Sequence, residues 1–463
     1  MTLAPARRPR PSERGRARTS IWLVAALAVL DTLAGTSAMA RQPVTMWFWG
    51  ATPRYRATLE RNLVAPFNAS QNRYTLRIEY RASVDSDVRN ALLAGGGPDL
   101  IYSSGPGDLV PLSRAGKLAP LEVYDRQYGW SQRLLGPLVS PCRQFGHLVC
   151  LPMSMQAGGM FYSQAVLHRF GWTVPTDVAT LENRMRQAMN AGLYASATGN
   201  MGWQPINIDY ASLFLNEWAG PGCVRAILTH ARRWTDPDFR VAIEQLDRWF
   251  SQGFIGGRDY FSLNFDKALL LLSQGRTPFV FAPTILFQWA GSYFPGPAGE
   301  DLRFAPFPRP TPSTDYPIYD VGLSFTYGIN ARSPVKDAAA QVLDRMISPA
   351  FIRQMAQVWP GYWGPPLVDF PSDPQAVGLT RSYLEAMATI SLAVHSGHFG
   401  YGIDSFFPPA TRQVFIRDLE ALWVGEESPK QLLSKAEETF ADETRVGTGI
   451  QPPAQGSPCT QTN

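Results

Sequence analysis

The sequence predicts an α/β fold built in two lobes, and three observations support this prediction. Strand-like and helix-like apolar segments alternate between residues 44 and 103, which is typical of a parallel sheet with helices on its faces. The chain has 463 residues, more than a single hydrophobic core usually serves. The short apolar segment Asp99–Ser103 ends in small polar residues, and open α/β sheets bind ligands beyond such strand ends.

The first elements follow from hydrophobic periodicity. The apolar segment Val44–Trp49 predicts a buried first strand. Large apolar residues then recur every four positions over residues 55–67, which predicts a helix. Residues 74–80 alternate between apolar and polar side chains, which indicates a second strand. A helix over Val88–Leu93 leads into the strand at Asp99.

After Leu151 the chain is predicted to become mainly helical. The Pro-rich stretch Phe304–Pro312 is expected to cross between the lobes, and Val321–Ile329 is expected to be a strand. The predicted helices are Asp177–Met189 with Thr176 as N-cap, Phe239–Phe250, Val335–Met346 after Ser333-Pro334, and Lys430–Phe440 after Ser428-Pro429.

Residues 1–40 have the order of features that a secretory signal peptide has. Six arginines precede the apolar run Ile21–Leu30, and Ala38-Met39-Ala40 forms an A-x-A cleavage site. The apolar run is too short to span a bilayer; an uncleaved N-terminal anchor is the alternative interpretation. We therefore expect cleavage after Ala40 and a periplasmic protein.

The basicity of the chain belongs to this N-terminal segment. The chain has 42 Lys and Arg against 38 Asp and Glu, and residues 1–40 hold six of the arginines with only Glu13 and Asp31. Beyond residue 40 the two signs therefore balance. Net charge gives no reason to expect a nucleic acid or an anionic membrane as partner. We expect a monomer that binds no nucleic acid.

The four cysteines suggest disulfides, because an exported chain matures in an oxidising compartment. Cys142 and Cys150 flank a hairpin centred on Gly146. A three-residue loop over 145–147 would place the two cysteines opposite each other, at a separation that a disulfide accepts. We predict this bridge and leave open whether Cys223 pairs with Cys459.

No metal site is expected. The cysteines form no C-x-x-C motif. His395 and His398 lie three positions apart, but no carboxylate or cysteine is close to them in sequence, and Gly397 argues against a helix that presents both. The sequence predicts neither a metal nor another cofactor.

Four blocks of sequence, in this order, resemble a known family. They are V-T-M-W-F-W-G after the signal peptide, P-D-L-I-Y-S-S with L-S-R-A-G-K-L-A-P-L, F-G-H-L-V-C-L-P-M-S-M-Q-A-G-G-M-F-Y-S-Q-A-V-L-H-R-F-G-W-T-V-P-T, and V-G-E-E-S-P-K-Q-L-L-S-K-A-E-E-T-F near the end. Their order and spacing resemble the extracellular solute-binding proteins of ABC importers, family 1, typified by maltose-binding protein. The chain departs from the family pattern at Tyr162-Ser163-Gln164, where the family usually has Y-N-K, and in its Cys142/Cys150 hairpin.

This resemblance implies a two-lobed periplasmic-binding-protein fold in which each lobe is a mostly parallel sheet flanked by helices. The ligand would lie in a crevice between the lobes, which close over it by hinge bending. The protein would be no enzyme; it would bind a small solute and deliver it to the permease subunits of an ABC importer. The implied organisation is residues 41–155 plus 307–349 in the N-terminal lobe, 156–306 plus 350–450 in the C-terminal lobe, and a mobile tail at 451–463.

Aromatic residues outside patterned elements are the first candidates for ligand contact. An aromatic ring stacks on the apolar face of a sugar, and its polar tip bonds hydroxyl groups. Trp47, Trp218 and Trp249 lie on patterned elements and are expected to belong to the core. The aromatic candidates are Trp49 at the end of the first strand, Trp203 in a Gly/Asn-rich loop, Trp289 after an apolar run, and Tyr362 and Trp363 in P-G-Y-W-G-P-P.

Polar candidates lie near the same predicted crevice. Ser103 and Ser104 end the Asp99 strand, Gln156 lies at the first lobe crossing, and Asp209 follows Trp203 closely. Asp99 itself is expected to stabilise a turn after Pro98. The aromatic loops favour a carbohydrate, above all an oligosaccharide. A polyamine would need several carboxylates beside the rings, and a phosphorylated ligand would need Arg, Lys or helix N-termini.

Two other functions remain open at this point. One is an exported enzyme that acts on polysaccharides, for which paired carboxylates would suffice, although the chain has no G-x-S-x-G or H-E-x-x-H motif. The other is a binding accessory on the same fold that takes no part in transport.

Overall fold

The computed structural model describes residues 40–312, 314–447, 450, 452–454 and 459. The predicted signal peptide, apart from Ala40, lies outside these residues. The chain divides into a segment of residues 1–41 and a compact unit of residues 42–463, and the compact unit contains all the elements below. Among the described residues, no helix is both long enough and apolar enough to cross a membrane.

One mixed sheet forms the centre of the compact unit. Its strands follow the order β2-β1-β3-β9-β6-β7, with β10 beside β9 and β8 beside β6, and a separate hairpin joins β4 to β5. The strands of the described chain are β1 (Gln42–Trp49), β2 (Tyr74–Arg81), β3 (Leu100–Ser103), β4 (Arg143–Gln144), β5 (His147–Leu148), β6 (Cys150–Ser163), β7 (Phe279–Pro283), β8 (Leu302–Ala305), β9 (Tyr319–Ile329) and β10 (Phe399–Tyr401).

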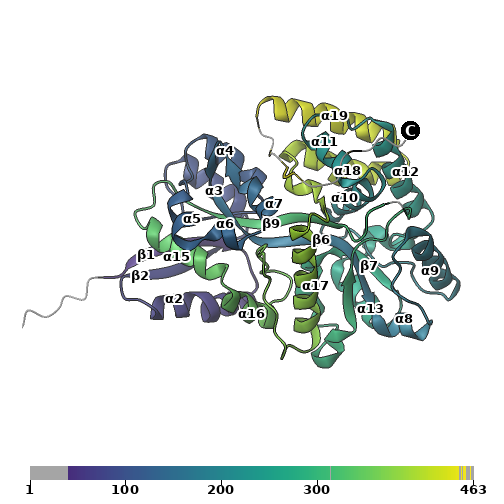
Figure 1. Ribbon diagram of the computed structural model, residues 1–463, viewed down its shortest axis with the longest axis horizontal. Coiled ribbons are helices and arrows are strands. Elements are labelled where there is room, and N and C mark those ends of the chain that lie inside the picture. The colour runs from purple at the N-terminus through teal and green to yellow at the C-terminus, as the bar shows by residue number, and fades with distance from the viewer. Residues whose placement is uncertain (1–39, 313, 448–449, 451, 455–458, 460–463) are drawn as a thin grey trace, which may run out of the picture. The chain divides into compact units, whose positions relative to one another are not determined.

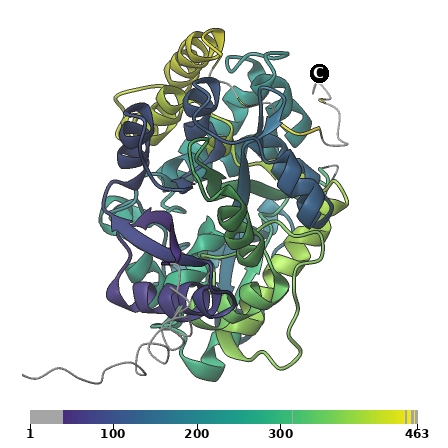
Figure 2. The ribbon, with the colours of Figure 1, turned by 90° about the vertical axis from the view of Figure 1, so that its left-hand side faces the viewer.

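Helices cover this sheet on both sides (Figures 1 and 2). Those of the first part are α1 (Pro53–Leu59), the π-helical η1 (Glu60–Val64), α2 (Ala65–Ala69), α3 (Val84–Leu93), η2 (Pro106–Leu109), α4 (Val110–Arg114), α5 (Glu122–Tyr128), α6 (Trp130–Arg133), α7 (Gly136–Val139) and η3 (Ser140–Cys142). The middle part contains α8 (Gln164–Arg169), α9 (Val178–Asn190), α10 (Ile206–Trp218), α11 (Pro221–Leu228), α12 (Pro237–Ser251), η4 (Gly257–Ser262), α13 (Phe265–Ser273), η5 (Thr284–Leu286), α14 (Phe287–Ala290) and η6 (Gly296–Glu300). The last part contains α15 (Lys336–Met346), α16 (Pro349–Val358), α17 (Gly378–His395), η7 (Ile403–Ser405), α18 (Pro409–Trp423) and α19 (Pro429–Arg445).

The first three strands confirm the predicted strand–helix–strand alternation. β1 pairs in parallel with β2 along its whole length and with β3 at Met46 and Leu100. Val44, Met46 and Phe48 are fully buried, while the intervening residues of β1 are partly exposed, which is the period of two expected for a strand. Figure 2 shows purple helices on one side of these strands and dark-blue helices on the other.

The two longest strands, β6 and β9, connect the two halves of the sheet. They run antiparallel from the pair Cys150/Gly328 to the pair Gly158/Asp320, with a bulge between Pro152 and Met155. β9 also pairs with β3, while the far end of β6 pairs with β7 and β8. In Figure 1 both strands run between the purple strands at the left and the teal helices at the right. Because β9 returns antiparallel between β3 and β6, the sheet is parallel in the first part of the chain and mainly antiparallel beyond it.

Helix positions follow the predictions within a few residues. The predicted helix Asp177–Met189 is α9, but its N-cap is Asp177 rather than Thr176. The Asp177 carboxylate accepts a hydrogen bond from the Thr180 backbone N–H at 2.8 Å and therefore satisfies one of the donors at the helix start. The predicted Ser428 cap of α19 is confirmed, as a capping box with Gln431.

The hairpin before β6 differs from its prediction, and so does the cysteine pairing. Its loop has two residues, Phe145 and Gly146, both with positive φ, so that Gln144 pairs with His147. A two-residue loop shifts the register by one position, and the Val149 N–H bonds the Cys142 carbonyl at 3.0 Å. Cys142 and Cys150 are both buried, and no disulfide joins them, so the predicted bridge is absent from the structure.

The disulfide of the described chain joins Cys223 of α11 to Cys459. Pro453 lies in the same C-terminal segment, and its carbonyl accepts hydrogen bonds from Arg225 at 3.1 Å and from the Tyr401 hydroxyl at 2.7 Å. The described residues of the segment predicted to be a mobile tail are therefore attached to α11 and β10.

The tryptophans expected in the core differ in burial. Trp249 is fully buried, and its indole N–H donates to the Glu182 carboxylate at 2.8 Å. Trp47 and Trp218 are half-buried. The Arg81 guanidinium lies over the Trp47 ring, 4.1 Å from its centroid, because both side chains project from the same side of neighbouring strands.

Candidate functional site

A cavity of about 600 Å³ lies over the sheet where β1, β3, β6 and β9 meet α10, α14 and α18, and we call it the cleft. It combines aromatic rings with polar side chains, which is the composition expected of a small-molecule site. Its lining consists of Trp49, Tyr102, Ser104, Gln156, Gly158, Trp203, Pro205, Ile208, Asp209, Pro283, Ile285, Gln288, Trp289, Asp320, Gly322, Leu323, Ser324, Tyr362, Gly402, Asp404, Arg412, Gln413 and Ile416.

The cleft brings together most of the residues that the sequence singled out, although they come from distant parts of the chain. That they contact a ligand stays a prediction. The residues that line the cleft as expected are Trp49, Ser104, Gln156, Trp203, Asp209, Trp289 and Tyr362.

Ser103 and Trp363 do not line the cleft. Ser103 is 2% exposed, and its hydroxyl bonds the Gly105 carbonyl at 2.5 Å. Alternation along β3 explains the difference, because Tyr102 and Ser104 share the face opposite Ser103. Trp363 is fully buried, stacks on Phe48, and donates its indole N–H to the Met346 carbonyl.

Hydrogen bonds fix the aromatic end of the cleft. The Trp49 indole N–H donates to the Tyr362 hydroxyl at 2.5 Å. Tyr362 is 5% exposed and stacks on Trp359 and Phe325 with ring centroids 4.3 and 4.7 Å apart. Burial raises the pKa of Tyr362 well above its ordinary value, so its phenol stays protonated at neutral pH and can donate.

Gln156 is held rigidly in the middle of β6. Its amide oxygen accepts from the Thr284 hydroxyl at 2.9 Å, and its amide nitrogen donates to the Ser154 hydroxyl at 2.7 Å. Because β6 connects both halves of the sheet, this side chain lies where the two halves join. Its orientation is set before any ligand arrives.

Two carboxyl groups of the cleft, Asp320 and Asp404, were not predicted from the sequence. Asp320 begins the predicted strand at Val321, and Asp404 lies in η7, directly after β10. Both line the cleft together with the predicted Asp209 of α10. Asp320 could have been predicted, because it is a carboxylate at the start of an apolar strand. Asp404 belongs to no motif, and it reaches the cleft because β10, which precedes it, pairs with β9.

The carboxyl groups of this cluster hold protons more tightly than ordinary ones. Burial raises the pKa of Asp404 to about 6, although Arg412 opposes the shift. Burial also raises the pKa of Asp209, with a further contribution from the Asp404 charge. The pKa of Asp320 rises by burial and then through the charges of Asp209, Asp404 and Glu217.

This cluster predicts a pH-dependent effect of Asp404→Asn on stability. The pKa of Asp404 is about 6 in the folded protein, whereas an aspartate in an unfolded chain has a pKa of about 4. As the pH rises from about 4 to about 6, the unfolded chain therefore loses its proton first, and the folded protein becomes less stable. Asparagine cannot ionise, so the melting temperature of Asp404→Asn should rise relative to that of the parent protein between about pH 4 and about pH 6 and should keep a constant lead at higher pH.

Thermal unfolding of both proteins across this range checks the prediction. The control is Asp369→Asn, at an exposed carboxylate outside the cleft, for which we expect a constant difference from the parent. A constant difference for Asp404→Asn as well would contradict the raised pKa.

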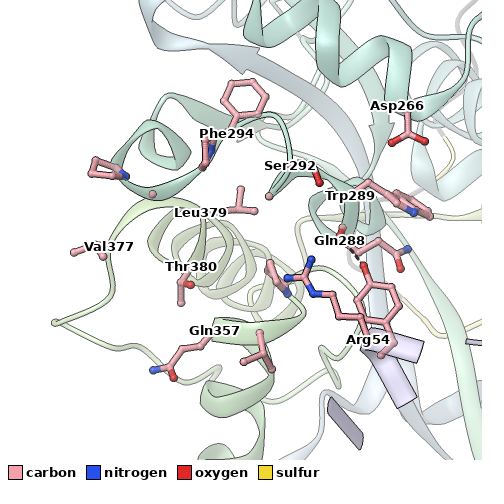
Figure 3. A pocket seen from close by; sticks show the side chains of 17 residues that line it. Arg54, Asp266, Gln288, Trp289, Ser292, Phe294, Gln357, Val377, Leu379 and Thr380 are labelled. Carbon is pink, nitrogen blue, oxygen red and sulfur yellow. Dashed lines mark hydrogen bonds between the residues drawn. The ribbon is translucent and has the colours of Figure 1, made fainter. Parts of the chain in front are cut away.

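Two further cavities adjoin the cleft. One, of about 350 Å³, shares Gln288 and Trp289 with it and is bordered by Arg54 and Thr380 (Figure 3). The other, of about 600 Å³, shares Trp203, and it also shares Pro205, Gln413 and Ile416. Trp289 thus lies between the cleft and the first of these cavities, and Trp203 lies between the cleft and the second.

No group of three or more His, Cys, Asp or Glu side chains in the described parts of the chain is arranged to hold a metal ion. The carboxylates of the cleft therefore do not form a preassembled cation cage.

Comparison with known proteins identifies relatives. A family model for bacterial extracellular solute-binding proteins matches residues 52–351. No curated protein sequence matches the chain significantly. Among solved structures, a chitin oligosaccharide binding protein is 18% identical with a TM-score of 0.70, and the match covers 87% of this chain and 99% of that one.

Two other solved structures are similar. Maltose-bound MalE3 of T. maritima is 16% identical with a TM-score of 0.67, and the match covers 86% of this chain and 99% of that one. A sugar transporter protein of Bacillus licheniformis in complex with stachyose is 14% identical with a TM-score of 0.64. The match covers 86% of this chain and 100% of that one. At these identities the likeness shows the fold, and it confirms the predicted two-lobed α/β class.

Proposed function

The chain belongs to the bacterial extracellular solute-binding proteins, and from that premise we propose that it is exported, binds a sugar in the cleft and delivers it to an ABC importer. The family and the similar structures are binding proteins rather than enzymes. We propose accordingly that the chain catalyses no reaction, acts as a periplasmic monomer, and has membrane permease subunits as its partners.

The ring set of the cleft is the observation that carries the sugar assignment. Trp49, Trp203, Trp289 and Tyr362 line one cavity together with carboxylate and amide groups. Rings bind the apolar faces of sugars, and the polar groups bind their hydroxyls. The two cavities that share lining residues with the cleft support an oligosaccharide over a single sugar.

We also propose that the cleft closes by rotation about β6 and β9. These strands are shared by both halves of the sheet, and the bulge between Pro152 and Met155 interrupts their ladder. The predicted lobes, 41–155 plus 307–349 and 156–306 plus 350–450, would move toward each other around this region. A ligand held by rings of both lobes would stabilise the closed state.

Calorimetric titration of residues 41–463 with neutral and amino mono- and oligosaccharides tests the proposal, and Trp203→Ala locates the site. Loss of one stacking ring costs about 1.4 kcal/mol, so we expect about ten-fold weaker sugar binding. The matched control is Trp47→Ala, which removes a half-buried tryptophan outside the cleft lining and should leave the affinity unchanged.

Three outcomes would contradict this function. Failure of every sugar to bind, or binding of glycerol phosphates or polyamines alone, would overturn the carbohydrate assignment. Consumption of sugar during the titration would show that the protein is an enzyme. An equal loss of sugar affinity in Trp203→Ala and Trp47→Ala would show that the binding site is not in the cleft.

A further inference from the structure

The polar lining of the cleft is strongly acidic, although the chain beyond residue 40 is neutral. Asp209, Asp320 and Asp404 reach the cleft from α10, β9 and η7. Among the described residues that line the cleft, Arg412 is the one cationic side chain. The lining of the cleft therefore holds more acidic than basic side chains, although the chain beyond residue 40 has equal numbers of both.

Arg412 does not neutralise this charge. Its guanidinium lies 3.6 Å from the carboxylate of Asp108, which approaches it from η2. One arginine is thus shared between Asp108 and Asp404, whose pKa it lowers against the effect of burial. Behind the cleft, Glu217 is 5% exposed and adds a further carboxyl group beside Asp320.

Two of these carboxyl groups, Asp209 and Asp320, have few hydrogen-bond donors from the protein, whereas Asp404 accepts from the Ser405 hydroxyl at 3.4 Å. The Oδ2 atom of Asp209 is fully buried and has no partner. Asp320 is 5% exposed, and its Oδ1 accepts one long bond of 3.3 Å from Asn216, whereas its Oδ2 accepts no hydrogen bond from the described residues. Buried acceptors without donors are costly, and buried charges without counter-charges more so.

A neutral sugar would supply donors for these oxygens, but it would not favour the ionised form of Asp209 and Asp320, which burial disfavours. The described residues form no metal cage, and no lysine is among the described residues of the lining. An ammonium group supplies three donors and a positive charge together. Trp49, Trp203, Trp289 and Tyr362 add aromatic faces, which attract cations as well as sugar rings.

We propose that the ligand of the cleft is an amino sugar, whose protonated amine is bound by Asp209, Asp320 and Asp404 while its rings stack on the tryptophans. This inference rests on the proposed sugar-binding function and narrows its ligand class to cationic saccharides.

The test compares three β-1,4-linked trisaccharides that differ at one ring position. They are the trimers of glucosamine, of N-acetylglucosamine and of glucose, titrated calorimetrically into residues 41–463 at neutral pH. Acetylation removes the charge and keeps the ring and the nitrogen. We expect the glucosamine trimer to bind at least about ten-fold more tightly than either neutral trimer.

Charge-removing variants identify the groups responsible. Asp209→Asn and Asp404→Asn, made separately, keep the side-chain shape and should reduce the ratio of the affinity for the glucosamine trimer to the affinity for the glucose trimer. The matched control Asp369→Asn lies outside the cleft and should retain the full preference. The ligand comparison on the unmodified protein does not depend on how well a variant folds.

The outcomes separate this inference from the proposed function. Equal or tighter binding of a neutral trimer would overturn the amino-sugar inference and leave sugar binding intact. Failure of all three trimers, of the other sugars and of amino monosaccharides would overturn both, and so would binding of a polyamine in their place. Calcium binding without sugar, abolished by Asp209→Asn, would also overturn the inference, because the carboxylates would then serve a metal ion.

Discussion

Replacing Asn216 with alanine is expected to lower the free energy of unfolding by about 3–5 kcal/mol, because it leaves several buried polar groups unpaired. Asn216 is 1% exposed on α10. Its amide nitrogen donates to the Tyr401 carbonyl at 2.8 Å, and its amide oxygen accepts from the Tyr401 N–H at 2.9 Å. The side chain thereby completes the hydrogen bonding of β10, the strand that leads to Asp404.

Chemical denaturation of Asn216→Ala measures this effect. The matched control is Asn90→Ala, at an exposed position of α3, for which we expect a change within about 0.5 kcal/mol. Asn216→Ala should also weaken ligand binding, because η7, which carries Asp404, follows β10 in the chain and would be less firmly held. After the loss of Asn216, the bond from the Ile403 N–H to the Ser212 hydroxyl at 2.9 Å would still attach η7 to α10. A loss no larger than that of Asn90→Ala would contradict this account of α10 as the anchor of β10.

Removal of the disulfide should have the second large effect. Cys223 and Cys459 are 236 positions apart, so their bond closes a very long loop and strongly restricts the unfolded chain. We expect Cys223→Ala/Cys459→Ala to lose about 2–4 kcal/mol of stability. Neither cysteine lines the cleft, so the affinity for sugar should remain.

Melting temperatures with and without a thiol reductant test this prediction. Reductant should lower the melting temperature of the parent protein to that of the double variant and should leave the variant unchanged. A further fall in the variant would reveal a bond between Cys142 and Cys150, which the sequence predicted and the structure lacks. No difference between parent and variant would show that the bond contributes nothing to stability.

The prediction of secondary structure succeeded where periodicity was unambiguous. β2 and the helical segment over residues 55–67 were evident from periods of two and four, and β1 was evident as an apolar segment. The hairpin was harder, because loops of two and three residues both fit a single glycine at position 146. One residue of register then decided whether Cys142 faces Val149 or Cys150.

The site could be predicted only in part, for a related reason. Strand-end and loop positions identified seven of the cleft residues, including Trp203 and Asp209. Tyr362 lines the cleft and its neighbour Trp363 does not, and the sequence could not distinguish them. Both lie in a loop, which has no periodic pattern that shows which side chains face the cleft. Asp320 and Asp404 meet only because β10 is inserted beside β9, a long-range pairing that no local pattern announces.

The length of β6 gives its bulge a mechanical significance. Ser163 lies nine positions beyond Ser154, which at the rise of a strand is about 30 Å. A rotation of about ten degrees at the bulge therefore displaces the far end of the strand by about 5 Å, as a lever magnifies movement at its pivot. Gln156, two positions from that pivot, would barely shift. In the closure that we propose, the outer elements would therefore move far while the middle of the cleft would keep its geometry.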